Sequence, residues 1–196
     1  MFRLNIIIIC ICIVLSGCLV RPVVIKTDAH LHEEQNTIIQ KAIKQVAKTG
    51  DWLVIRGYHA TDNLVANATG IPISHVGVYN AENKSVIEAE GKGVHLSSFS
   101  EFIDKSYRII VIRPRWKNKT NSMEVWNEAK RLVGRSYDFL GTIGFNYPAK
   151  YYCSELAINI YKPWFSGNEK FPDVIKPGEL YLYGVILYDS LPRDEM

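Results

Sequence analysis

Ser74-His75-Val76-Gly77-Val78-Tyr79 predicts a β-strand that begins with a histidine, because apolar residues alternate along it. Five residues rich in Asn and Glu separate it from a second strand over 85–89, so the pair predicts a β-hairpin. Further along the chain, Tyr151-Tyr152-Cys153-Ser154-Glu155-Leu156 opens an amphipathic helix with a cysteine at its start. The sequence thus predicts helices combined with an antiparallel sheet, and supplies a histidine and a cysteine at the starts of two elements.

The rest of the chain adds elements of the same two kinds. Helices are expected over 33–48, over 98–105 after a capping box formed by Ser98 and Glu101, and over 121–133. Strands are expected over 52–56, 108–113 and 179–188, and a long loop, with or without a short helix, over 57–72. The predicted fold class is α+β, with an antiparallel sheet packed against helices.

Length and composition favour a single domain over 33–196 with no role in nucleic-acid binding. The chain has 196 residues, a formal net charge of +3 and 47% hydrophobic residues, enough for one core of ordinary size. Its Lys and Arg residues are spread along the chain and form no basic run, which gives nucleic-acid binding no support. The sequence contains no repeat or low-complexity linker that would divide this domain.

The N-terminus has the pattern of a secretory signal that ends in a lipid-attachment box. A short positive region precedes an apolar run that is too short to span a bilayer, and Leu15-Ser16-Gly17-Cys18 follows. The box resembles that of bacterial lipoproteins, which implies removal of 1–17, acylation of Cys18 and a tether over 18–32. Because Leu19 is not Asp, the same resemblance favours an outer-membrane anchor facing the periplasm. The alternative is an uncleaved anchor helix; either way the domain lies outside the cytoplasm.

Cys153 is expected to be the one unpaired thiol of the mature chain, because Cys10 and Cys12 lie in the signal. A thiol attacks acyl groups only as a thiolate, and a helix N-terminus or an adjacent imidazole favours that form. Cys153 lies at a predicted helix N-terminus, and His75 is a candidate for the adjacent imidazole. The alternatives are a buried structural cysteine, since its neighbours three and four residues on are apolar, and a histidine buried in the sheet.

Five motifs, in this order, resemble the YiiX/YaeF-like group of permuted NlpC-type, papain-like cysteine hydrolases. They are Gly50-Asp51-Trp52-Leu53-Val54, Ser74-His75-Val76-Gly77-Val78-Tyr79, Val86-Ile87-Glu88-Ala89, Gly134-Arg135-Ser136-Tyr137-Asp138 and Tyr152-Cys153-Ser154-Glu155-Leu156. In the ordinary NlpC arrangement the cysteine helix comes before the histidine strand, whereas here His75 precedes Cys153. The resemblance covers about 50–161 and implies a permuted papain-like fold.

The resemblance also implies roles for individual residues. Cys153 is the expected nucleophile, His75 the expected base, and Glu88 the polar residue that fixes the imidazole. Glu90 is the rival for this third place, since it shares one face of a regular strand with Glu88. Tyr137 matches a tyrosine whose hydroxyl could donate to the oxyanion; the alternative is an aromatic ring packed on the core.

We therefore expect a cysteine hydrolase held at the membrane through Cys18, acting on peptide or amino-acid-derived amides such as cell-wall fragments. The alternatives are a thioesterase or acyltransferase on lipid substrates, and an envelope protein that binds without catalysis. No phosphate loop or dinucleotide motif is present, so no cofactor is expected. Asp28, His30 and His32 offer metal donors, but they lie in the expected tether without further ligands at good spacing, so no metal is expected.

Overall fold

The computed structural model describes residues 23–196, so the predicted signal and Cys18 lie outside the described residues. The six strands are β1 (Trp52–Gly57), β2 (His75–Asn80), β3 (Ser85–Glu90), β4 (Gly93–Ser98), β5 (Ser106–Pro114) and β6 (Gly184–Asp189). The α-helices are α2 (Ala29–Val46), α3 (Ala60–Thr69), α4 (Phe99–Asp104), α5 (Ser122–Leu132) and α6 (Cys153–Asn159). Short 3-10 helices occur at Gly141–Ile143, Lys162–Trp164, Pro177–Tyr183 and Arg193–Glu195. Within 23–196, no helix combines the length and the hydropathy needed to cross a bilayer.

The strands form one antiparallel sheet in the order β4-β3-β2-β1-β5-β6. The predicted hairpin is β2–β3, and its register pairs Gly77 with Glu88. Glu88 in turn pairs with His95 of the edge strand β4. Since paired residues point to the same face of a sheet, this register brings polar side chains of three adjacent strands together.

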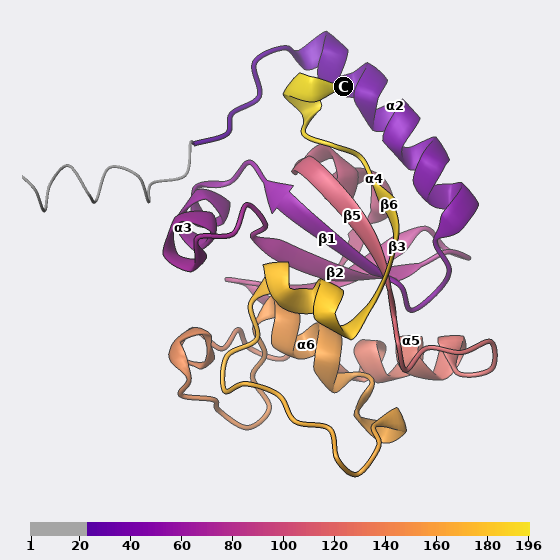
Figure 1. Cartoon of the computed structure of the whole chain (residues 1–196), viewed down its shortest axis with the longest axis vertical. Helices are drawn as coiled ribbons and strands as arrows, with labels where there is room; N and C mark the ends of the chain where they lie inside the picture. The colour runs from indigo at the N-terminus through magenta and orange to yellow at the C-terminus, as the bar shows by residue number, and fades with distance from the viewer. Residues whose placement is uncertain (1–22) are drawn as a thin grey trace, which may run out of the picture.

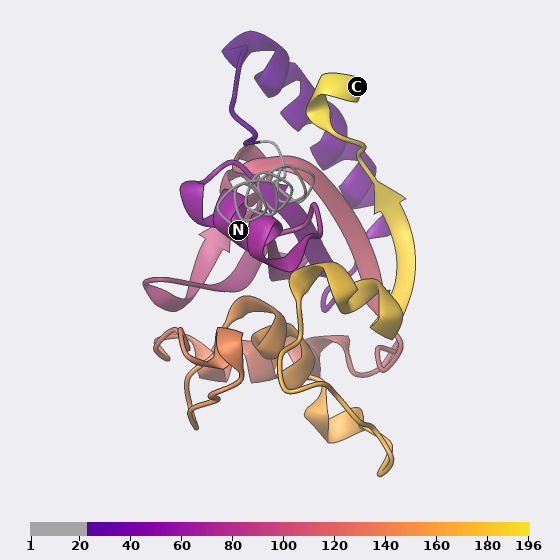
Figure 2. The ribbon, with the colours of Figure 1, turned by 60° about the vertical axis from the view of Figure 1, so that its left-hand side comes forward.

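Helices cover both faces of the sheet (Figure 1). Trp52 and Val54 of β1 point to the face covered by α5 and α6, and they share one apolar core with Leu156 of α6. Leu53 and Ile55 alternate to the opposite face, which α2 and α4 cover. The turned view in Figure 2 shows α2 on one side of the sheet and the segment from α5 to α6 on the other. The predicted α+β class is confirmed, as three layers with the sheet in the middle.

Several boundaries differ from the sequence prediction. The first helix begins at Ala29 and not at 33, because the Asp28 side chain accepts hydrogen bonds from the backbone N–H groups of His30 and Leu31 and caps it. Consequently 29–32, expected in the tether, are helical. The strand β4 was not predicted: Gly91 precedes it, Gly93 begins it and Leu96 is 55% exposed, so its alternation is weak. The strand expected over 179–188 begins only at Gly184, after the 3-10 helix Pro177–Tyr183.

Candidate active site

Cys153 begins α6, as predicted, and is 5% exposed in the apolar core between that helix and the sheet. The helix is fixed at its start: the Glu155 carboxylate accepts from the Tyr152 backbone N–H, and the Ser154 hydroxyl donates to the Ile175 carbonyl at 2.5 Å. The thiol is free, as the only cysteine of the described residues. A buried thiol at a fixed helix start has a defined direction, which a nucleophile needs.

His75 is the first residue of β2, and its imidazole is 9% exposed at the end of the strand. Its Nε2 lies 2.5 Å from Oε2 of Glu88, on the neighbouring strand β3. The Glu90 carboxylate is farther from the same nitrogen, at 3.8 Å. Of the two carboxylates left open by the sequence, Glu88 is therefore the one that contacts the imidazole.

The charges around His75 favour its protonated form. Burial of the ring lowers its pKa, but hydrogen bonds with Cys153 and Glu88, together with their negative charge, outweigh burial and raise the pKa of His75 to about 10. Burial raises the pKa of the Glu88 carboxyl, but the hydrogen bond with His75 and the positive charges of His75 and Lys105 shift it below its ordinary value. At neutral pH these shifts favour an imidazolium beside a carboxylate, and Cys153 also forms a hydrogen bond with the imidazole.

Three further polar residues surround Glu88, and none of them was predicted. Lys105 Nζ donates to Oε2 of Glu88 and, at 2.5 Å, to Oε1 of Glu90. The Ser97 hydroxyl donates to Oε1 of Glu88 at 2.6 Å, and His95 Nε2 lies 3.6 Å from the same oxygen. Ser97 and His95 both belong to β4, so a prediction of that strand would have brought them beside Glu88.

Tyr137 lies close to the nucleophile, in the segment that connects α5 to α6. It forms a parallel β-bridge with Tyr151, two residues before Cys153. Burial, and after it the negative charge of Cys153, raises the pKa of the Tyr137 hydroxyl, which therefore stays protonated and able to donate. Its ring also packs edge-on against Phe139, at 4.8 Å between centroids, so the predicted packing role and the predicted donor role are compatible.

His75, Glu88 and Glu90 could together bind a metal ion, since one donor atom from each lies within 4.8 Å of the others. The ammonium of Lys105, however, already bridges the two carboxylates. The residues therefore fit a cation only if Lys105 moves away from the two carboxylates. Asp28, His30 and His32, the donors considered from the sequence, have separate partners instead: Asp28 caps α2, the His30 ring lies 3.6 Å from Glu34, and the His32 ring bonds to Asp104.

A cavity of about 690 Å³ adjoins Glu88, Glu90 and Lys105 on the face covered by α2 and α4. Neither Cys153 nor His75 lines it. The charge of Cys153 contributes to the raised pKa of Tyr137, so the connection between α5 and α6 lies close to the thiol.

Comparisons with known proteins show the family and the fold of the chain. The family of permuted papain-like amidase enzymes named YaeF/YiiX, C92 matches residues 46–167, which include His75, Glu88 and Cys153. No curated protein matches significantly. Among solved structures, the chain is similar to one titled metalloprotein yiiX from Escherichia coli O157:H7, with 23% sequence identity and a TM-score of 0.51.

That similarity covers 60% of this chain and 66% of the solved one, so this chain spans just under two thirds of its length. At 23% identity it supports the fold alone, and the fold agrees with the permuted order in which His75 precedes Cys153. The family match covers more than half of the chain and shows the family. The chain belongs to the permuted papain-like amidase family YaeF/YiiX.

Proposed function

We propose that this protein is a lipid-anchored cysteine hydrolase of the bacterial cell envelope, an amidase that cleaves peptide or amino-acid-derived amides through Cys153, His75 and Glu88. The observation that carries the site assignment is the contact chain from Cys153 through the His75 imidazole to Glu88. Membership of an amidase family supports the reaction class. The signal and lipid box that end in Cys18 support the envelope location.

The geometry suggests how the bond is broken. Because Nε2 of His75 contacts Glu88, the other ring nitrogen, Nδ1, is the one that exchanges a proton with Cys153. The Cys153 thiolate attacks the amide carbonyl carbon, and the C–N bond breaks as the imidazolium gives its proton to the leaving nitrogen. The amine leaves, and a thioester remains on Cys153.

The second half of the reaction regenerates the thiolate. His75 takes a proton from water, the resulting hydroxide attacks the thioester, and the C–S bond breaks to release the acid. The Tyr137 hydroxyl and the Cys153 backbone N–H would donate to the oxyanion in both halves. Glu88 stays ionised throughout and holds the imidazole in orientation, as the shift of its pKa below the ordinary value supports.

A second candidate is hydrolysis or transfer of an acyl group from a thioester or ester of a lipid. Phe139, which is 65% exposed and packs against Tyr137, favours this candidate because it places an apolar side chain beside the site. Lipid activity predicts a gain in rate when micelles are added. Amidase activity predicts turnover of soluble aminoacyl or peptide amides without them.

The test uses the chain over 23–196, which contains Cys153 as its single thiol. We expect rapid alkylation by iodoacetamide at pH 7, and a slowing of about tenfold or more in His75→Ala, because an isolated thiol supplies little thiolate at that pH. His30→Ala is the matched control, since that side chain is 87% exposed. Amide hydrolysis should be lost in Cys153→Ala and in His75→Ala and kept in the control. Slow alkylation that His75→Ala leaves unchanged would make Cys153 a structural cysteine.

The anchor needs a separate test. Mass spectrometry of the membrane-extracted protein should find a chain that begins at Cys18 and carries acyl groups. A chain that still begins at Met1 would replace the lipid anchor by an uncleaved one. Neither outcome bears on the alkylation of Cys153, so the lipid anchor and the active site are tested independently.

A further inference from the structure

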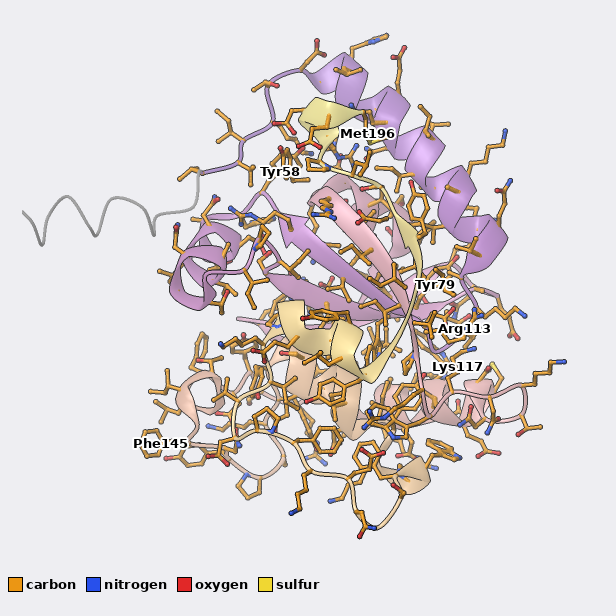
Figure 3. The ribbon with its side chains drawn as sticks, in the orientation of Figure 1. Tyr58, Tyr79, Arg113, Lys117, Phe145 and Met196 are labelled. Atoms are coloured by element: carbon orange, nitrogen blue, oxygen red, sulfur yellow. The ribbon has the colours of Figure 1, made fainter. Side chains whose placement is uncertain are left out.

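Residues 139–147, here called the apolar loop, carry large apolar side chains that the fold leaves in contact with solvent. They lie on the connection between α5 and α6 and begin two residues after Tyr137. Phe139, Leu140, Ile143, Phe145 and Tyr147 are between 46% and 66% exposed. Figure 3 shows Phe145 at the left-hand edge of the molecule, outside the packed helices. A group of this kind on a folded surface marks an interface with a membrane or another molecule.

The exposure does not follow from a loose backbone. The buried Asp138 carboxylate accepts from the backbone N–H of Gly141 at 2.9 Å and from that of Tyr147 at 2.8 Å. The Phe145 backbone N–H donates to the Leu140 carbonyl at 3.0 Å. A Cβ at Gly141 would lie 2.7 Å from the Asp138 carboxylate, so the loop fits only with glycine there. The chain therefore fixes the apolar loop in one shape and directs its side chains outward.

The charges beside the apolar loop fit an anionic surface. Arg135 precedes it and Lys150 follows it, and both are exposed. Asp138, the one acidic residue between them in the sequence, is buried, and its carboxylate accepts two backbone hydrogen bonds. The exposed Asp173, whose backbone carbonyl accepts from Asn146 of the apolar loop, leaves one positive charge in excess among these exposed residues. Exposed aromatic and aliphatic side chains flanked by cations are the composition that inserts into the interface of anionic phospholipids.

The N-terminal end of the described chain lies on the same side. The backbone N–H of Val24 donates to the Asn63 side chain of α3 at 3.1 Å, which fixes the point where the chain enters the domain. In Figure 1 this entry point, α3 and the apolar loop all lie on the left-hand side, and they come forward together in Figure 2. Val23 and Ile25, at the entry point, are 65% and 66% exposed. Cys18 precedes Val23 by five positions, which span at most about 18 Å.

We infer that the apolar loop inserts into the surface of a phospholipid bilayer and holds the Cys153 site facing it. The orientation rests on the proposed anchor at Cys18, whose short link keeps this side of the domain near the membrane; the insertion itself does not. Phe139 of the apolar loop packs against Tyr137, whose pKa the charge of Cys153 helps to raise, so insertion brings the candidate site close to the lipid surface. The substrate class that this geometry serves is an amide or acyl group displayed at or near a membrane.

The test measures binding of 23–196 to vesicles of phosphatidylethanolamine with a minority of phosphatidylglycerol. This chain keeps every core residue of the described part, of which Ile39 comes first. We expect it to float with the vesicles. The variant with Ile143→Ser and Phe145→Ser should lose about tenfold or more of this affinity. Ile38→Ser is the matched control, because that side chain is 57% exposed but belongs to α2, on the opposite side in Figure 1. Absence of binding by the unchanged chain, or an equal loss in Ile38→Ser, would overturn the inference.

A second measurement serves if the double variant fails to fold. Tryptophan in place of Phe145 (F145W) should add fluorescence that brominated phospholipids quench, whereas Ile38→Trp should not. A dimer of the unchanged chain that disappears in the double variant would mean that a second copy covers the apolar loop, and would overturn the inference. The alkylation rate of Cys153 should be the same in the loop variants, so loss of vesicle binding is distinguishable from failure of the proposed active site.

Discussion

The Lys105 ammonium donates to the same oxygen of Glu88, Oε2, that lies 2.5 Å from the His75 ring. The second oxygen of Glu88 accepts from Ser97 at 2.6 Å, so both oxygens of the buried carboxylate are bound. Such a carboxylate can neither rotate nor take up a proton easily, which fits it to orient the imidazole. Lys105 is thus a positioning residue that acts on His75 through Glu88.

Lys105→Met should destabilise the fold at neutral pH, on the order of 3 kcal/mol, because it leaves Glu88 buried and Glu90 close by without their shared cation. The pKa of Glu88 is lowered in the folded chain, so stabilisation of its charged form is present above the ordinary value and lost as the pH falls. The difference in unfolding free energy between the two chains should therefore shrink on acidification. Urea unfolding at several pH values measures this difference, and Lys92→Met, at an exposed position, is the control. A difference that does not change with pH would contradict the pairing of Lys105 with Glu88.

Removal of Lys105 should also create a metal site. The donors of His75, Glu88 and Glu90 already lie within 4.8 Å of one another, and the ammonium competes with a cation for both carboxylates. Lys105→Ala should bind Zn²⁺ at least about tenfold more tightly than the unchanged chain, as titration calorimetry can measure. The bound ion should inhibit hydrolysis by this variant, because it coordinates the His75 imidazole. Equal Zn²⁺ affinity in the two chains would mean that the ammonium does not block the site.

The two carboxylates left open by the sequence can be separated by amide substitutions. Glu88→Gln keeps the shape but removes the charge that favours the imidazolium, so kcat/KM should fall by about two orders of magnitude. Glu90→Gln, whose carboxylate is 3.8 Å from the imidazole and 35% exposed, should lose about tenfold or less. Steady-state rates on a soluble amide measure both changes. A larger loss in Glu90→Gln than in Glu88→Gln would make Glu90 the carboxylate that orients His75.

Much of the fold could be predicted because its central strands and longest helices repeat apolar residues at regular spacing. Strand β2 and helix α5 were found in this way, to within one residue at each end. Strand β4 was missed because it lies at the sheet edge, where Leu96 faces solvent. The 3-10 turn before Gly184 was missed because its apolar residues resemble the start of a strand.

The candidate active site, like the fold, could be predicted only in part. The resemblance predicted His75, Cys153 and Glu88, and the two-residue period of a strand made Glu90 the rival for the third place. Only the register of β2 on β3, with the side-chain distances it produces, selects Glu88. Lys105 could not be predicted, because it reaches the carboxylates only after α4 folds across the sheet face, and no local pattern encodes that contact.

Tyr137 offers the sharpest separation between activating the thiol and stabilising the oxyanion. Its hydroxyl makes no hydrogen bond within the described residues, and its raised pKa keeps it a donor, so Tyr137→Phe removes a donor without leaving a buried polar partner unpaired. We expect kcat to fall about 100- to 1000-fold with the fold intact. The alkylation rate of Cys153 should stay within about twofold, because alkylation forms no oxyanion and leaves His75 and Glu88 in place. A parallel loss of alkylation would assign Tyr137 to the packing of the site instead, since a purely structural residue would disturb both reactions.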